Sequence, residues 1–224
     1  MGESQFHLLK TRRFLPLFVT VLLGAANDNV FKNALLILIL FTLGREVPME
    51  EAVLVTLASG IFILPFFIFS ATAGQLADKY EKSRMIRWIK LAEVVIMGAG
   101  VAALQFGDVY WLLTVLFLMG VQSSFFGPLK YSILPTLLRK NELIGGNAFV
   151  EAGTFLAILV GTIIGGLTAG WENGVNIVAA IVFGLAVIGW MCSYGIPQAA
   201  APQPELRISY NIVTQTYRII RRIR

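Results

Sequence analysis

Six long apolar stretches, separated by short polar connections, run through this sequence. They cover residues 14–43, 52–76, 91–106, 109–129, 146–169 and 175–196. A helix needs roughly 20 apolar residues to cross the hydrocarbon core of a bilayer, and the third stretch approaches that length if it begins at Met85. The pattern therefore predicts six transmembrane helices, with a charged loop at 78–90 between the second and the third.

Composition places the chain among polytopic membrane proteins. Of the 224 residues, 57% are hydrophobic and 14% are charged, whereas a soluble domain has about 25% charged residues. The single Cys192 excludes an internal disulfide. We expect no cleavable signal peptide, because the first apolar run is too long and no small-residue cleavage site precedes its polar patch. The net charge of +5 is no sign of nucleic-acid binding, because most basic residues fall in predicted loops.

The basic residues also predict the orientation. They gather in residues 1–13, 78–90, 131–145 and 198–224, which lie on one side of a six-helix topology, whereas the opposite loops offer only Arg45. Because cytoplasmic loops are enriched in Lys and Arg, we expect both termini in the cytoplasm. The predicted domains are a cytoplasmic tail at 1–13, a six-helix transmembrane bundle at 14–197, and a cytoplasmic segment at 198–224. That last segment begins with a Pro/Ala linker and continues as a weakly amphipathic basic helix, which we interpret as an ordinary cytoplasmic loop.

The first span carries polar groups at bilayer depth. Asp28 and Lys32 are four residues apart and share a helix face in the order that favours an ion pair, while Asn29 and Asn33 form a second pair. An ionisable group in the middle of a membrane costs roughly 2.5–3.5 kcal/mol, so these side chains must face protein or water. We interpret them as the lining of a transport pathway. The alternative is a buried ion pair that only fixes helix packing.

The stretch 74–84 resembles the signature loop of the major facilitator superfamily. Matching residues include Gly74, Asp78, Lys79 and Lys82, whereas Glu81 replaces a usual Gly and Ser83 a usual basic residue. A glycine allows close helix approach, and Asp78 is placed to pair with Lys82 or Arg84 as a cytoplasmic gate. The resemblance implies an all-α membrane protein that corresponds to the N-terminal half of this fold. That N-terminal half consists of two three-helix units in a 3+3 inverted repeat. The second six-helix half of the complete fold is absent from the sequence.

Three further segments resemble the lysophospholipid transporter family within that superfamily. They are Asn27-Asp28-Asn29, residues 126–134 and residues 146–152. Asn27, in place of a Gly, and the additional charge of Lys32 depart from the family pattern. The resemblance implies that the protein flips lysophospholipids across the bacterial inner membrane. The chain is also similar to the transporter domain fused to an acyltransferase and an acyl-carrier-protein ligase in some bacteria.

Lys130 and Glu151 are further candidates for the headgroup site. Both are expected near the cytoplasmic ends of their spans, where an ammonium and a carboxylate can bind the two charges of a zwitterionic headgroup. Snorkelling of Lys130 and a salt bridge between the two residues are the alternatives. The roles of Glu93 and Gln122, in the cavity or between helices, remain open at this point. Four glycines of the fifth span are expected to form helix contacts: Gly161, Gly165, Gly166 and Gly170.

The sequence lacks the parts of an enzyme. Its single histidine, His7, lies in the N-terminal tail without the acidic partner that an acyltransferase needs, and no phosphate-binding loop is present. We expect no metal and no cofactor, because no cluster of metal-ligating side chains is evident. Two other functions stay open: a proton-coupled exporter of small amphiphilic compounds, with Asp28 as proton carrier, and a membrane domain that anchors a fused lipid enzyme.

Overall fold

The computed structural model describes residues 5–44 and 47–206, and the described part is helical. Six of its helical segments are long and apolar enough to cross a membrane: Leu15–Leu43, Glu51–Lys79, Lys82–Phe106, Val109–Leu137, Lys140–Ala169 and Gly174–Ser193. The predicted all-α architecture of six spans is therefore confirmed. Arg45 and the basic helix expected after residue 206 lie outside the described residues.

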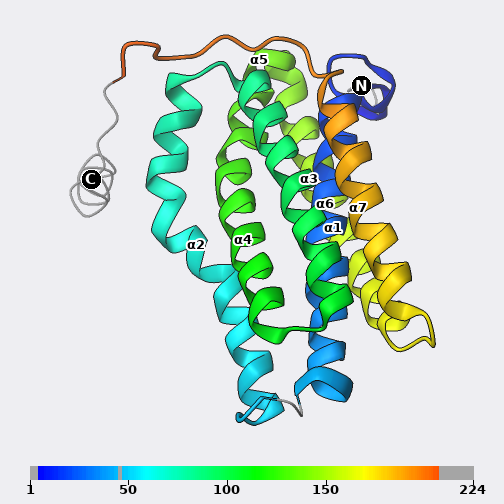
Figure 1. The fold of residues 1–224 in the computed structure, drawn as a ribbon. Coiled ribbons are helices and arrows are strands. Elements are labelled where there is room, and N and C mark those ends of the chain that lie inside the picture. The colour runs from blue at the N-terminus through cyan, green and yellow to red at the C-terminus, as the bar shows by residue number, and fades with distance from the viewer. Residues whose placement is uncertain (1–4, 45–46, 207–224) are drawn as a thin grey trace.

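The chain begins with a short 3-10 helix, η1 (Gln5–Lys10), and then runs back and forth between two ends of the bundle (Figure 1). The elements that follow are α1 (Leu15–Leu38), the π-helical turn η2 (Ile39–Leu43), α2 (Glu51–Lys79), α3 (Lys82–Phe106), α4 (Val109–Ser132), α5 (Leu134–Leu137), the 3-10 turn η4 (Lys140–Glu142), α6 (Leu143–Ala169) and α7 (Gly174–Ser193). The N-terminus, the α2–α3 connection, α5 and the segment after α7 lie at the same end. This is the end at which the sequence places its basic loops.

The connection between the second and third spans is shorter than predicted. The expected loop at 78–90 is wrong, because α2 continues to Lys79 and α3 already begins at Lys82. Glu81 makes this early start favourable, since its carboxylate accepts hydrogen bonds from the amides of Ser83 and Arg84 and so caps α3. At the other end of α3, Gly107 adopts φ +70°, a left-handed conformation that favours glycine, and ends the helix.

Close helix pairs give the bundle its shape. α1 packs on α6 and α7, α2 packs on α4, and α3 packs on α7 and α4. Pro65 lies inside α2, and Figure 1 shows this helix bent midway, as expected where a proline removes a backbone hydrogen bond. Gly120 of α4 permits the contact with α2, because a Cβ at this position would lie 2.4 Å from the Phe62 carbonyl oxygen.

The glycines of α6 face two directions. A Cβ on Gly161 would lie 2.6 Å from the Ala26 carbonyl oxygen, and one on Gly165 would lie 2.3 Å from that of Val30. These two glycines therefore let the backbones of α1 and α6 approach closely. Gly166 has nothing within 4 Å of its Cβ position, and the nearest atom for Gly170 is in its own helix. The structure thus gives a helix contact to the first pair of predicted glycines only.

Candidate functional site

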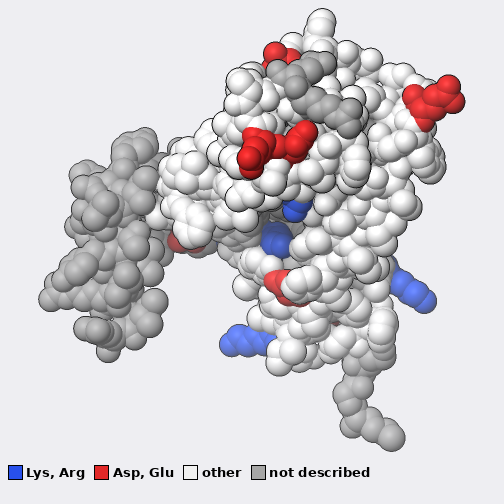
Figure 2. All heavy atoms as spheres, turned by 90° about the horizontal axis from the view of Figure 1, so that it is seen from below, with Lys and Arg blue, Asp and Glu red and all other residues white. Residues whose placement is uncertain are grey.

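A cavity of about 200 Å³ lies between α1, α2, α3, α4 and α6. Both signs of charge line it, since Asp28 and Glu93 contribute carboxylates and Lys90 and Lys130 contribute ammonium groups. Seen from the end opposite the N-terminus, the bundle is hollowed, and Lys or Arg side chains are visible inside the hollow (Figure 2). The remaining lining residues are Val21, Gly24, Ala25, Asn29, Phe62, Phe66, Gln122, Ser123, Phe126, Gly127, Thr154 and Ile158.

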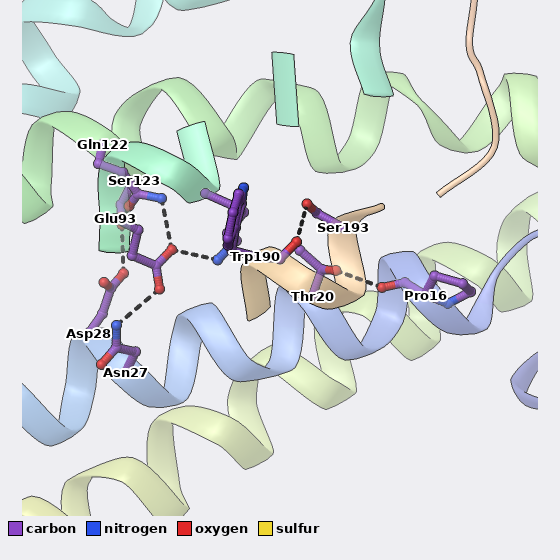
Figure 3. A network of polar contacts seen from close by, with 10 residues as sticks. Pro16, Thr20, Asn27, Asp28, Glu93, Gln122, Ser123, Trp190 and Ser193 are labelled. Atoms are coloured by element: carbon purple, nitrogen blue, oxygen red, sulfur yellow. Dashed lines mark hydrogen bonds and ion pairs between the residues drawn. The ribbon is translucent and has the colours of Figure 1, made fainter. Parts of the chain in front are cut away.

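Glu93 is the centre of a buried polar network on one wall of this cavity. Its Oε2 atom lies 2.6 Å from Lys90 Nζ and accepts a hydrogen bond of 3.0 Å from Gln122 Nε2. Its Oε1 atom accepts a hydrogen bond of 3.0 Å from Asn27 Nδ2. Ser123 extends the network to Asp28, to which its hydroxyl donates a hydrogen bond of 2.6 Å (Figure 3). The network therefore joins α1, α3 and α4 around two carboxylates.

Gly24 of α1 leaves the space in which the Lys90 ammonium reaches this network. The Lys90 side chain is only 1% exposed, and a Cβ on Gly24 would lie 2.2 Å from its Nζ atom. The ammonium also lies 4.7 Å from the centre of the Phe126 ring, a cation–π distance. Lys90 was assigned to a cytoplasmic loop from sequence, and this assignment is wrong. Its spacing of three residues from Glu93 was the signal in the sequence that indicated a pair on one helix face.

Lys130 lines the cavity from α4. Its ammonium donates a hydrogen bond of 3.3 Å to the Thr154 hydroxyl on α6 and lies 4.9 Å from the centre of the Tyr131 ring. Glu151 does not line the cavity; it accepts a hydrogen bond from the Tyr131 hydroxyl. The salt bridge considered between Lys130 and Glu151 is not formed within the described residues. The two residues are instead neighbours linked through Tyr131.

The polar residues of α1 separate into two groups. Asp28 and Asn29 line the cavity, whereas Lys32 lies 5.5 Å from the centre of the Phe62 ring. Asn33 donates hydrogen bonds to the Asn29 carbonyl oxygen and to the Thr162 hydroxyl of α6. The ion pair expected between Asp28 and Lys32 is absent from the described part of the chain: the Asp28 carboxylate accepts a hydrogen bond from the Ser123 hydroxyl of α4, and the Lys32 ammonium lies beside Phe62 of α2.

The predicted gate loop has different contacts from those expected. Across the described ranges, Asp78 forms no ion pair with Lys82 or Arg84, and nothing within 4 Å surrounds the Cβ position of Gly74. Lys79 lies beside the ring of its neighbour Tyr80. The expected pairing is therefore wrong for this conformation.

Contacts at this turn come instead from the segment after α7. The amide of Ala199 donates to the Glu81 carboxylate, and the amide of Lys82 donates to the Ala199 carbonyl oxygen. Further along, the amide of Gln203 donates to the carbonyl oxygen of Asp78. Burial tends to raise the pKa of Glu81, but hydrogen bonds from the Ser83 side chain and from backbone amides, that of Ala199 included, lower it below the ordinary 4.5. The Glu81 carboxylate is thus held charged between two segments.

A helical bundle with charges of both signs around an internal cavity is typical of membrane transporters, and comparison with known proteins agrees. The family model described as Major Facilitator Superfamily matches residues 17–224. The chain belongs to the major facilitator superfamily. The predicted fold, the N-terminal half of this superfamily's structure, is confirmed together with the family.

Relatives with curated descriptions show which members of the superfamily the chain is similar to. The chain is 32% identical over 157 residues to the protein named lysophospholipid transporter LplT of Escherichia coli O1:K1 / APEC. It is 31% identical over 157 residues to the protein of the same name in Escherichia coli O7:K1 (strain IAI39 / ExPEC). Each match covers 70% of this chain and 37% of the relative, so the chain spans well under two thirds of these relatives' length. The predicted resemblance to lysophospholipid transporters is confirmed.

Proposed function

We propose that this chain is the N-terminal half of a transporter that moves lysophospholipids across the bacterial inner membrane by alternating access. The observation that carries the proposal is the cavity in which Asp28 and Glu93 face Lys90 and Lys130 inside an otherwise apolar bundle. Charges at this depth are expensive and in membrane proteins mark the path of a polar substrate. The names of the relatives supply the substrate class.

The cavity suggests a role for each end of a lysophospholipid. The ammonium of a zwitterionic headgroup would bind the Asp28 carboxylate, and its phosphate would bind Lys130 by a charge-assisted hydrogen bond, with Asn29 beside them. The rings of Phe62 and Phe66 line the same cavity and offer an apolar surface for the acyl chain. This division matches an amphiphile with a charged head and one tail.

We assign supporting roles to the other predicted site residues. Glu151 would influence Lys130 through Tyr131, to which it is hydrogen-bonded. Lys32 and Asn33 would support α1 and its neighbours, because neither lines the cavity and their side chains contact Phe62 and Thr162.

The whole transporter would need partners for this half. We propose that a second six-helix half closes the cavity and that residues 198–224 begin the cytoplasmic connection to it, since the relatives are much longer than the matched region. A fused or associated acyltransferase would consume the lysophospholipid delivered. The proposed inner-membrane location, with residues 1–13 and 198–224 in the cytoplasm, is supported by the basic residues at that end of the bundle.

Uptake of labelled lysophosphatidylethanolamine tests the function. Spheroplasts that lack their own lysophospholipid transporter and carry the full-length gene product should accumulate the label. Asp28→Asn and Lys130→Gln should each reduce uptake at least about tenfold, as expected from losing one charge-assisted hydrogen bond of about 1.5–3 kcal/mol. Lys32→Gln is the matched control outside the cavity and should retain most activity. Normal uptake by both cavity variants would overturn the site. Absence of lysolipid uptake, together with export of small amphiphilic compounds that depends on a pH gradient, would favour the exporter.

A further inference from the structure

A second pocket lies on the outer surface of the bundle, away from the cavity that Asp28 lines. A pocket of about 200 Å³ is formed where α3 and α7 pack together, at the end that carries η1 and the α2–α3 connection. Two guanidinium groups and three aromatic rings surround it, and no acidic residue is among them. The lining residues are Arg84, Arg87, Trp88, Leu91, Trp190 and Tyr194.

We propose that this pocket binds the phosphate group of an anionic membrane phospholipid. Arg84 and Arg87 favour this ligand, since the planar guanidinium group can donate two parallel hydrogen bonds to the oxygen atoms of a phosphodiester. Aromatic residues such as Trp88 and Trp190 are typical of the headgroup level of a bilayer. The pocket therefore combines positive charge with the depth at which lipid phosphates are found.

Arg87 has capacity left for such a ligand. One of its terminal nitrogens donates a hydrogen bond of 3.2 Å to the Ile196 carbonyl oxygen, and its guanidinium lies 5.4 Å from the centre of the Tyr194 ring. Its Nε atom is buried and has no hydrogen-bond partner among the described residues. A buried unpaired donor is costly, and a phosphate oxygen would satisfy it. The contacts to Ile196 and Tyr194 hold the group in place beside the pocket.

The surface below the pocket suits an acyl chain. Leu91, Gly98 and Gln105 follow Arg84 at steps of seven residues on α3, so all four share one face. A separate groove lies further along this seam and is lined by Gly98, Val101, Gln105, Asn176, Ala179, Ala180 and Phe183. From Arg87 to Gly98, where this groove begins, the helix rises about 16 Å, which matches the roughly 15 Å depth of one leaflet's hydrocarbon, so the end of an acyl chain would reach the groove. Small residues at Gly98, Ala179 and Ala180 leave room for one chain in the seam.

Tryptophan quenching by brominated lipids tests this site, because two of the four tryptophans, Trp88 and Trp190, line it. The purified chain would be placed in nanodiscs that contain either brominated phosphatidylglycerol or brominated phosphatidylcholine at equal mole fractions. We expect an about tenfold higher apparent affinity for phosphatidylglycerol, given that each basic residue near the membrane surface adds to the attraction of anionic lipid. Equal quenching by both lipids in the unaltered chain would overturn the proposal, and this comparison needs no variant.

A matched pair of double variants locates the effect. Arg84→Gln with Arg87→Gln should reduce the preference for phosphatidylglycerol to near one. Lys10→Gln with Arg12→Gln removes the same charge from exposed positions at the same end and should leave the preference unchanged. Loss of preference in both double variants would show a diffuse attraction, and loss on addition of inorganic phosphate would show a site for free anions; either result would contradict a lipid site. Transport is not measured in any arm, so failure here is separate from failure of the proposed function.

Discussion

Lys90 and Glu93 form an ion pair inside the helix bundle, with 2.6 Å between Nζ and Oε2. Their side chains are 1% and 3% exposed, and they lie one helical turn apart on α3. Such a pair is tolerated when every lone pair and proton is satisfied, and here Asn27 and Gln122 complete the hydrogen bonds of the carboxylate. Glu93 of α3 therefore holds α1, which carries Asp28, and α4 in place around the cavity.

The first prediction concerns this pair. Lys90→Met should destabilise the chain by about 3–5 kcal/mol, because it leaves a buried carboxylate without its counter-charge. Adding Glu93→Gln should recover a large part of that loss, since the neutral amide can accept from Gln122 and, once the Asn27 amide flips, donate to the Asn27 Oδ1 atom. Thermal unfolding in detergent, followed by circular dichroism, measures both changes. A single variant as stable as the unaltered chain would show that the pair is unimportant for folding.

The second prediction compares two neighbouring glycines of α6. Gly165→Ala should cost about 1–3 kcal/mol, because its methyl group would meet the Val30 backbone oxygen and push α1 away from α6. Gly166→Ala is the matched control, with open space around the new methyl, and should be neutral or stabilising by up to about 1 kcal/mol because alanine favours a helix. The same unfolding measurement applies. Equal effects of the two substitutions would contradict the assigned contact face.

The third prediction concerns Glu81 and the segment that follows α7. Because hydrogen bonds lower the folded-state pKa of Glu81 below its unfolded value, its contribution to stability is present above about pH 4.5 and is lost as the pH falls through the folded-state pKa. The Ala199 amide, which donates to this carboxylate, should therefore lose protection from hydrogen exchange in acid.

Exchange at individual amides, corrected for the intrinsic effect of pH, provides the measurement. Glu81→Gly should expose the Ala199 amide at every pH, because the acceptor is gone. The Tyr80 amide donates to the Leu76 carbonyl oxygen, a group that does not titrate, and serves as the control. Strong protection of Ala199 in the Glu81→Gly variant would exclude the carboxylate as its anchor.

The sequence predicted the spans well because hydrophobic runs depend on local composition. The polar patch at Asp28 and the candidate Lys130 were also visible, since a charge within an apolar run stands out. Lys90 was missed because a charged stretch precedes it, so it resembled part of the loop. In the structure, Arg84 and Arg87 of that stretch line a pocket on the outer surface while Lys90 faces inward, and this division depends on which faces of α3 are covered.

Pairings between helices could not be predicted in the same way. The spacing of Asp28 and Lys32 indicated an ion pair, but Ser123 of α4 binds the carboxylate in the folded chain. Likewise, the hydrogen bond between the Ala199 amide and the Glu81 carboxylate joins residues 118 positions apart. Such choices depend on three-dimensional packing, and a single sequence reports only on neighbours along the chain.

Protection of a cavity cysteine by lysophosphatidylethanolamine would show directly whether the headgroup binds in this cavity. Gly127 lines the cavity and has nothing within 4 Å of its Cβ position, so Gly127→Cys introduces a thiol without a clash. In a Cys192→Ser background, a water-soluble maleimide would label this thiol, and Thr136→Cys, at an exposed position outside the cavity, would be the control.

We expect lysophosphatidylethanolamine to slow labelling at Gly127→Cys several-fold, to leave labelling at Thr136→Cys unaffected, and to lose its effect when Asp28→Asn is added. Labelling of Gly127→Cys at the same rate with and without the lipid would contradict a headgroup site in this cavity.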